Sequence, residues 1–190
     1  MASTYSPSLR IELIGTGDQS GLWGETTNNN LGALIEQAIT GYQSIAMTDT
    51  DYTLTALNGS VDQARNVILE FTSIGSLSAT RNIFIPAVEK TYVIKNSTTG
   101  AQSITVKTST GTGITIINGG TTFVYCDGTN THQASQYFPT LSVGSISIAS
   151  GTTGSGSFVL QTNPAITSPT ISTPTISNQV STGGTLTNVT

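Results

Sequence analysis

Few residues of this chain have side chains suited to catalysis or metal binding. His132 is the only histidine and Cys126 the only cysteine. A serine hydrolase needs a serine, a histidine and an orienting acid, and a structural zinc site needs several His or Cys ligands at short spacings. No Gly-x-Ser-x-Gly elbow surrounds a serine. We therefore interpret His132 as a solvated or hydrogen-bonded loop residue and expect no enzymatic activity.

Two acidic clusters lie in turn-like sequence, at Asp49-Thr50-Asp51 and at Asp127-Gly128-Thr129-Asn130. Calcium loops gather several oxygen ligands within about a dozen residues and usually close with a glutamate, which neither stretch does. Aspartate beside threonine or glycine is common in turns, so we expect structural roles for both clusters. Asn96-Ser97-Thr98 matches a glycosylation acceptor, but it has no consequence without a secretion signal. The sequence predicts no cofactor and no metal.

The composition narrows the choice of partners. Charged residues form 8% of the 190 residues, and the net charge is −4. The six basic residues are scattered from Arg10 to Lys107, whereas nucleic-acid binding needs a basic patch. The start of the chain does not resemble a signal peptide, and no window approaches the apolar length of a membrane span. We expect a protein made and kept in a cytosol, bound neither to nucleic acid nor in a membrane.

The first element that could position a site is an N-terminal arm. Leu9, Ile11 and Leu13 alternate with Arg10 and Glu12, which is typical of a half-buried strand. A glycine-rich turn follows, and then Trp23, the only tryptophan. A lone aromatic can anchor a partner or stack on a sugar, but we favour packing beneath the helix that comes next.

The clearest periodic pattern predicts one helix of about four turns, from near Asn28 to near Thr40. Thr27 or Asn28 is expected to cap its start, and Gly41 lies where a helix tends to stop. Such a short helix needs a partner surface. Its apolar stripe consists of Leu31, Leu34, Ile35, Ala38, Ile39 and Tyr42.

From about Ile45 to Phe138 the hydrophobic period changes to two. Short strand-like runs alternate with turns rich in Gly, Asn and Asp, a pattern that predicts an antiparallel β-sandwich or barrel-like domain. Cys126 falls at the end of one such run. The runs are YTLTAL (52–57), NVILEF (66–71), RNIFIP (81–86), TYVIKN (91–96), QSITVKT (102–108), GITII (113–117) and TTFVYC (121–126).

The C-terminal part repeats every five residues, with Pro164, Pro169 and Pro174 in step with three isoleucines, Ile166, Ile171 and Ile176. An odd repeat cannot keep these isoleucines on one face of a flat strand. Three parallel copies wound around an axis could bury them, which predicts an extended trimeric fibre shaft. The alternative is a disordered low-complexity linker. The whole chain is thus expected to be mainly β, with an arm and helix (1–45), a β domain (46–138) and a shaft segment (139–190).

Several separated motifs resemble the N-terminal part of tail fibres of tailed bacteriophages, particularly of marine and cyanobacterial phages. The resemblance covers residues 1 to about 135. Its strongest anchors are Trp23-Gly24, residues 28–31, residues 81–95 and residues 125–129. It implies a homotrimeric fibre whose N-terminal region attaches to the tail, while a distal region recognises the host surface. The proline-spaced repeat is similar to fibre shaft sequence.

The first hypothesis is therefore a structural virion protein, located in the tail and synthesised in the host cytoplasm. Expected partners are further copies of itself, other tail proteins such as an adaptor, nozzle or baseplate component, and a host glycan or receptor contacted through distal regions. The alternatives are a carbohydrate-binding or carbohydrate-cleaving tailspike and a capsid decoration protein. Expected docking or trimer contacts are Leu9, Ile11, Leu13, Trp23, Leu31, Leu34 and Ile35, and expected shaft contacts are Ile166, Ile171 and Ile176.

Overall fold

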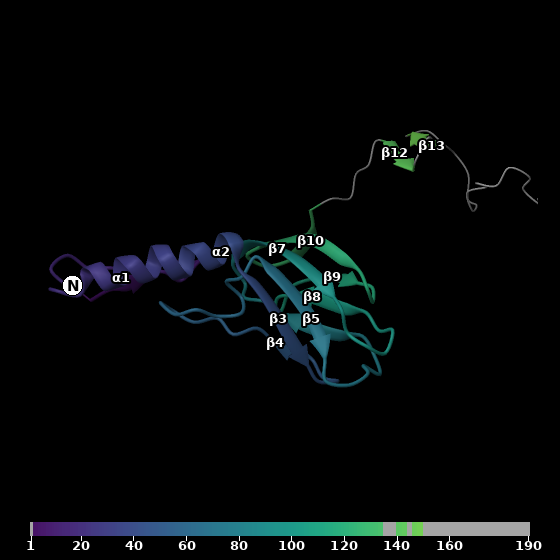
Figure 1. The fold of residues 1–190 in the computed structure, drawn as a ribbon, viewed down its shortest axis with the longest axis horizontal. Coiled ribbons are helices and arrows are strands. Elements are labelled where there is room, and N and C mark those ends of the chain that lie inside the picture. The colour runs from purple at the N-terminus through teal and green to yellow at the C-terminus, as the bar shows by residue number, and fades with distance from the viewer. Residues whose placement is uncertain (1, 135–139, 144–145, 150–190) are drawn as a thin grey trace, which may run out of the picture. The chain divides into compact units, whose positions relative to one another are not determined.

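The computed structural model describes residues 2–134, 140–143 and 146–149 (Figure 1). The chain separates into two compact units, residues 1–139 and 140–190. Strands predominate, and the helical residues lie together near the N-terminus (Figure 1). The mainly β fold class with one helical region is confirmed.

The helical region is longer than predicted. It comprises α1 (Trp23–Asn29), a π-helical segment η1 (Asn30–Ile35) and α2 (Glu36–Thr40). The expected caps are wrong, because Thr27 and Asn28 lie inside α1 and Leu22 precedes it without a side-chain cap. Hydrophobic periodicity did not predict this first part of the helix, because the residues before Leu31 are mostly polar. The end is as expected, since the backbone becomes extended at Gly41 (ψ 134).

The arm forms a short antiparallel pair, β1 (Thr4–Tyr5) with β2 (Glu12–Leu13). Only the last two residues of the predicted strand, Glu12 and Leu13, therefore lie in a strand. Arg10 interrupts it with a left-handed backbone conformation, φ 54, which is uncommon outside glycine. The Arg10 side chain is only 12% exposed and pairs with Asp62.

Two sheets make up the β domain of the first unit. The order in the five-stranded sheet is β11-β10-β7-β5-β3, and in the four-stranded sheet β4-β6-β8-β9. The bounds are β3 (Tyr42–Met47), β4 (Tyr52–Thr53), β5 (Ile68–Ser73), β6 (Arg81–Phe84), β7 (Glu89–Asn96), β8 (Ile104–Lys107), β9 (Gly113–Ile116), β10 (Thr121–Asp127) and β11 (Thr131–Gln133).

The predicted antiparallel arrangement is wrong for the first six of these strands. From β3 to β8 the chain passes alternately between the two sheets, and each strand pairs in parallel with the next one in its own sheet. Within these two sheets, the antiparallel pairs are β8 with β9, β7 with β10 and β10 with β11. A period of two reports which residues are buried and not the direction of the partner strand, so the sequence pattern could not distinguish the two arrangements.

The core lies on the inner faces of the two sheets. Buried residues alternate along β3, β5, β7, β8 and β10, as the period of two predicts. Cys126 joins this core from β10, in agreement with its predicted place at the end of a strand. The largest apolar members are Phe71, Leu69, Tyr92, Ile94, Ile83, Ile104, Val106, Ile116, Val124 and Met47.

One buried amide closes an end of this core. The Asn96 Nδ2 atom donates hydrogen bonds to the carbonyl oxygens of Gln102 and Ile116, each at 3.1 Å. Asn96 is completely buried, so the apparent glycosylation motif is inaccessible in the fold. It satisfies backbone acceptors that would otherwise be buried without partners.

In the second unit the structure describes an antiparallel hairpin of β12 (Thr140–Val143) and β13 (Ile146–Ala149). The expected shaft residues Ile166, Ile171 and Ile176 lie outside the described residues.

Gly41→Ala is expected to lower the free energy of unfolding by about 1–3 kcal/mol, because an added Cβ would lie 2.3 Å from the Gln37 carbonyl oxygen. Gly32→Ala is the matched control, since nothing lies within 4 Å of its Cβ position and alanine favours helix by about 1 kcal/mol. Urea unfolding followed by circular dichroism measures both changes. Equal effects of the two substitutions would contradict the packing at Gly41.

Candidate functional site

Exposed apolar side chains gather on the arm and the helical region. Trp23 is 63% exposed, Leu31 59% and Ile39 68%. Leu13 and Leu22 are also exposed. A single copy of the chain therefore leaves large apolar groups in water on the arm and the helical region. We define these five residues as the arm–helix surface, the candidate functional site of the chain.

The predicted contact residues divide into three groups. Leu13, Trp23 and Leu31 are exposed and free to meet a partner, whereas Leu34 is fully buried within its own chain. The favoured packing of Trp23 beneath the helix is wrong, because the side chain stands in solvent at the start of α1. The remaining three, Leu9, Ile11 and Ile35, are half-buried.

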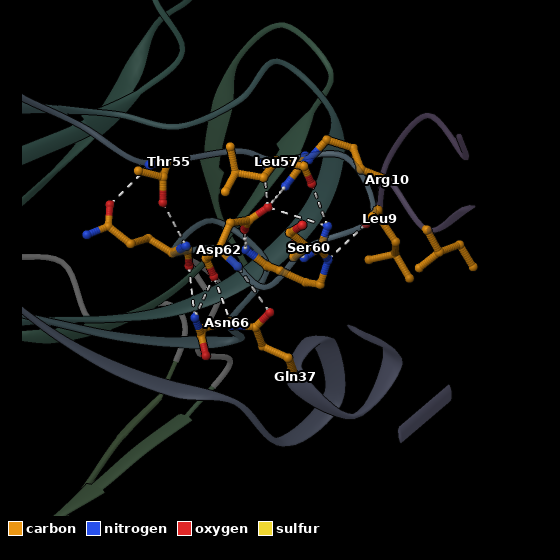
Figure 2. Close-up of polar contacts among 12 residues, drawn as sticks. Leu9, Arg10, Gln37, Thr55, Leu57, Ser60, Asp62 and Asn66 are labelled. Carbon is orange, nitrogen blue, oxygen red and sulfur yellow. Dashed lines mark hydrogen bonds and ion pairs between the residues drawn. The ribbon is translucent and has the colours of Figure 1, made fainter. Parts of the chain in front are cut away.

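A buried carboxylate fixes this surface to the β domain (Figure 2). The Asp62 side chain is completely buried, and its Oδ2 atom lies 3.0 Å from Nη2 of Arg10 in the arm. The same oxygen accepts a hydrogen bond from the Leu57 backbone amide at 2.8 Å, and Oδ1 accepts one from the Arg65 amide at 2.6 Å. A buried charge is tolerated only with such partners, so the arm and the loop before β5 are held together.

Arg65 completes the cluster from the same loop. Its side chain is fully buried, and Nη2 lies 3.4 Å from Oδ2 of Asp62. The guanidinium donates to the carbonyl oxygens of Leu9 and Leu57 at 2.9 Å each, and also to that of Ser60 (Figure 2). A planar group with five fixed donors is suited to join three carbonyls in this way.

Side-chain amides attach the helical region at its middle and near its C-terminal end. Asn30 donates to the Glu12 carbonyl oxygen at 2.7 Å and accepts from the Glu12 amide at 3.2 Å, which pairs η1 with β2. Near the C-terminal end, Gln37 donates to the Asp62 carbonyl oxygen at 2.9 Å (Figure 2). These hydrogen bonds hold the helical region in place within one chain. The exposed apolar side chains of the arm–helix surface have no such covering.

A second group of polar side chains lies at the end of β10 and β11. Nε2 of His132 lies 2.8 Å from Oδ2 of Asp127, and the imidazole stacks on the Tyr125 ring with centroids 5.0 Å apart. Backbone amides of Asn130 and Thr129, together with His132, lower the pKa of Asp127 to about 2. His132 is hydrogen-bonded, as predicted, but it lies in a strand rather than a loop.

This histidine and acid do not form a hydrolytic triad with a described residue. The adjoining cavity, of about 470 Å³, is lined by Glu89, Lys90, Thr91, Tyr125, Cys126 and Asp127. It contains no serine, and the cysteine is buried in the core. Sequence analysis missed the pairing, although the turn that brings Asp127 and His132 together is visible in the glycine at position 128, which has a φ of 94.

The outer face of the five-stranded sheet carries an apolar row. Strand register aligns Tyr42 with Ile68, Ile68 with Val93 and Val93 with Phe123. Tyr42, Ile68 and Phe123 are exposed. Sequence analysis assigned Tyr42 to the apolar stripe of the helix and so did not predict this row. Only strand pairing places these four residues side by side.

The two acidic clusters organise turns. Asp49 accepts from the Ser78 amide and hydroxyl and from Arg81, and these contacts lower its pKa to about 2. Asp51 accepts from the Asn82 amide and side chain. Within residues 2–134 and the short hairpin, no group of three or more His, Cys, Asp or Glu side chains is arranged to hold a metal ion.

The chain matches no protein-family model, no curated protein and no solved structure. In the part of the chain that the structure describes, no helix has the length and apolar character needed to cross a membrane.

Arg65→Lys is expected to lower the free energy of unfolding by about 3 kcal/mol, because a lysine ammonium cannot reach three carbonyls and its charge would remain poorly satisfied beside Asp62. Arg81→Lys is the control, since its pair with Asp49 is partly exposed and should change stability by less than about 1 kcal/mol. Urea unfolding of the two variants measures the difference. Equal losses would show that the buried cluster adds nothing to stability.

Asp127 predicts a dependence of stability on acid. Its folded pKa of about 2 lies below the ordinary 3.8, so its contribution is present above pH 3.8 and is lost as the pH falls towards 2. The difference in melting temperature between the wild type and Asp127→Asn should therefore be larger near pH 5 than near pH 2. Calorimetry at both pH values tests this. An unchanged difference would contradict the bonding described for Asp127.

Proposed function

We propose that this chain is a structural virion protein, the N-terminal portion of a homotrimeric phage tail fibre that attaches the fibre to the tail and supports host adsorption. The observation that carries the proposal is the arm–helix surface, five exposed apolar side chains on elements that polar contacts hold to the β domain. The resemblance of residues 1 to about 135 to tail fibre sequences supports the same assignment.

Self-association is the simplest way to cover this surface. Trp23, Leu31 and Ile39 lie in α1, η1 and α2, so exposed apolar side chains occur along the whole helical region and are available to meet residues of other copies. The low charge of the chain favours apolar and hydrogen-bonded contacts between copies over charge pairing. The half-buried Leu9, Ile11 and Ile35 would extend the contact around the arm.

The proposed location is the tail of the virion, after synthesis in the host cytoplasm. The proposed neighbours are other tail proteins, of the adaptor, nozzle or baseplate kind. Contact with a host glycan or receptor is proposed for distal regions of the fibre. No enzymatic role is proposed.

A second candidate function, a carbohydrate-binding tailspike, is favoured by one specific observation. Phe123 and Tyr125 are exposed on the same face of β10, and His132 stacks on Tyr125. Sugar rings stack on such aromatic faces, and Asp127 offers a carboxylate beside them. Binding of host polysaccharide that is lost in Tyr125→Ala, or its shortening on incubation, would favour this candidate over a purely structural role.

The proposed homotrimer predicts a mass of about three times 19.6 kDa in light scattering of the purified chain. Replacing Leu31 and Ile39 with glutamate should dissociate it, because burying two carboxylates in an apolar interface costs several kcal/mol per copy. The double variant should therefore have the mass of a monomer.

The matched control replaces Ile74 and Ile117 with glutamate. These side chains are 72% and 69% exposed, but they lie in turns of the β domain, so the trimer should persist. A wild-type chain that is a monodisperse monomer at micromolar concentration would overturn the proposal. Dissociation of both double variants alike would remove the assignment to the arm–helix surface.

A further inference from the structure

Lys90 lies on the core-facing side of β7. Buried residues follow it at every second position of the strand, at Tyr92, Ile94 and Asn96, so all four side chains belong to the same face. The strand register places Lys90 opposite Cys126 of β10, which is also buried. Lysine is rarely found on such a face unless a carboxylate pairs with it, so this position calls for a charged partner.

No such partner is present among the described residues, because no carboxylate there lies within ion-pair distance of the Lys90 Nζ atom. This atom instead lies 4.7 Å from the centroid of the Tyr92 ring, and the cation–π contact compensates only part of the cost of burying the charge. Lys95, on the opposite face of β7, differs because its Nζ atom lies 2.8 Å from Oε1 of Glu70. Of these two lysines, only Lys90 is relieved by losing its proton.

The surroundings of Lys90 favour its neutral amine. Burial is the main cause that lowers the pKa of Lys90 to about 8, while the charges of Arg10 and Arg65 act in the same direction and that of Asp62 in the opposite one. About a tenth of the Lys90 side chains are therefore neutral at pH 7, against about one in two thousand for an ordinary lysine. A neutral, desolvated lysine amine is a nucleophile towards carbonyl carbon.

This amine is accessible from a cavity. Lys90 lines the cavity of about 470 Å³ at the start of β7 and the end of β10, which has room for a small molecule. Within residues 2–134, the buried side-chain nitrogen and oxygen atoms that lack a hydrogen-bond partner belong to Arg10, Tyr92 and Thr131. Nζ of Lys90 is not among these atoms, so it remains in contact with solvent. A reagent that enters the cavity can therefore reach it.

The cavity discriminates between reagents by charge. Glu89 and Asp127 line it together with Lys90, and the strand register places these two acids opposite each other. Their carboxylates disfavour anionic acyl donors such as acyl phosphates. A neutral aldehyde or ketone meets no such repulsion, and the positive charge of its protonated imine would share the cavity with both carboxylates. The cavity therefore favours small neutral carbonyl compounds.

We infer that Lys90 is a covalent modification site at which small neutral aldehydes and ketones form a Schiff base. The Nζ lone pair forms a bond to the carbonyl carbon, and a proton passes from this nitrogen to the carbonyl oxygen. A second proton, from solvent, lets the resulting hydroxyl leave as water while the nitrogen lone pair forms the C=N bond of the protonated imine. No atom is oxidised or reduced, and water reverses the reaction. The site lies in the β domain and does not depend on the proposed function.

The test treats the full folded chain with acetaldehyde and cyanoborohydride, which reduces each imine to a stable secondary amine, and follows each lysine by peptide mass spectrometry. At pH 7, Lys90 should be trapped about tenfold or more faster than Lys95 and Lys107, because its larger neutral fraction outweighs its lower basicity. The ratio of the Lys90 rate to the Lys107 rate should fall severalfold between pH 7 and pH 10, where ordinary lysines also lose their protons.

The same chain unfolded in guanidinium chloride is the matched control, and there all three lysines should be trapped at similar rates. Trapping of Lys90 no faster than of Lys107 in the folded chain would overturn the site. A preference for Lys90 that persists after unfolding would also overturn it, because the fold would then have no part in the reactivity. Acetyl phosphate tests the selection by charge, and a preference for Lys90 as strong as that of acetaldehyde would overturn the assignment to neutral carbonyl compounds.

Discussion

The buried Asp62 carboxylate is the interaction on which the arrangement of the first unit depends. It lies in the long connection between β4 and β5, and it binds Arg10 from the arm and Arg65 from its own loop. A carboxylate without these partners would be costly to bury. The left-handed backbone at Arg10 is held in place by this pairing. The Asp62 backbone carbonyl also accepts from Gln37, which links the helical region to the same point.

The alternation of strands between two sheets explains how a chain with so few charges keeps a well-defined core. Each passage from one sheet to the other buries a few apolar residues between the sheets. Parallel pairing within each sheet then follows from the path of the chain, because every return to a sheet runs in the same direction. Antiparallel pairing begins only where β9 and β10 reverse that path.

The residues that stabilise one copy of the chain differ from those that are left uncovered for the proposed association. The core and the Asp62 cluster fix the fold of one copy, and the apolar residues that they leave uncovered lie on the arm, on the helical region and in the row across β3, β5, β7 and β10. Exposed apolar groups at defined positions on a rigid support are typical of surfaces that bind other proteins. The structural role that we propose in a larger assembly depends on these surfaces.

The sequence by itself determined the local features. Alternation identified most strands and their buried faces, Gly41 marked the end of the helix, and Cys126 was recognised as a strand residue. Strand direction, the burial of Arg65 and the pairing of Asp127 with His132 were decided only by the tertiary structure. The physical reason is that burial periodicity is local, whereas strand pairing and charge pairing join segments whose spacing in the sequence has no fixed relation to their distance in space.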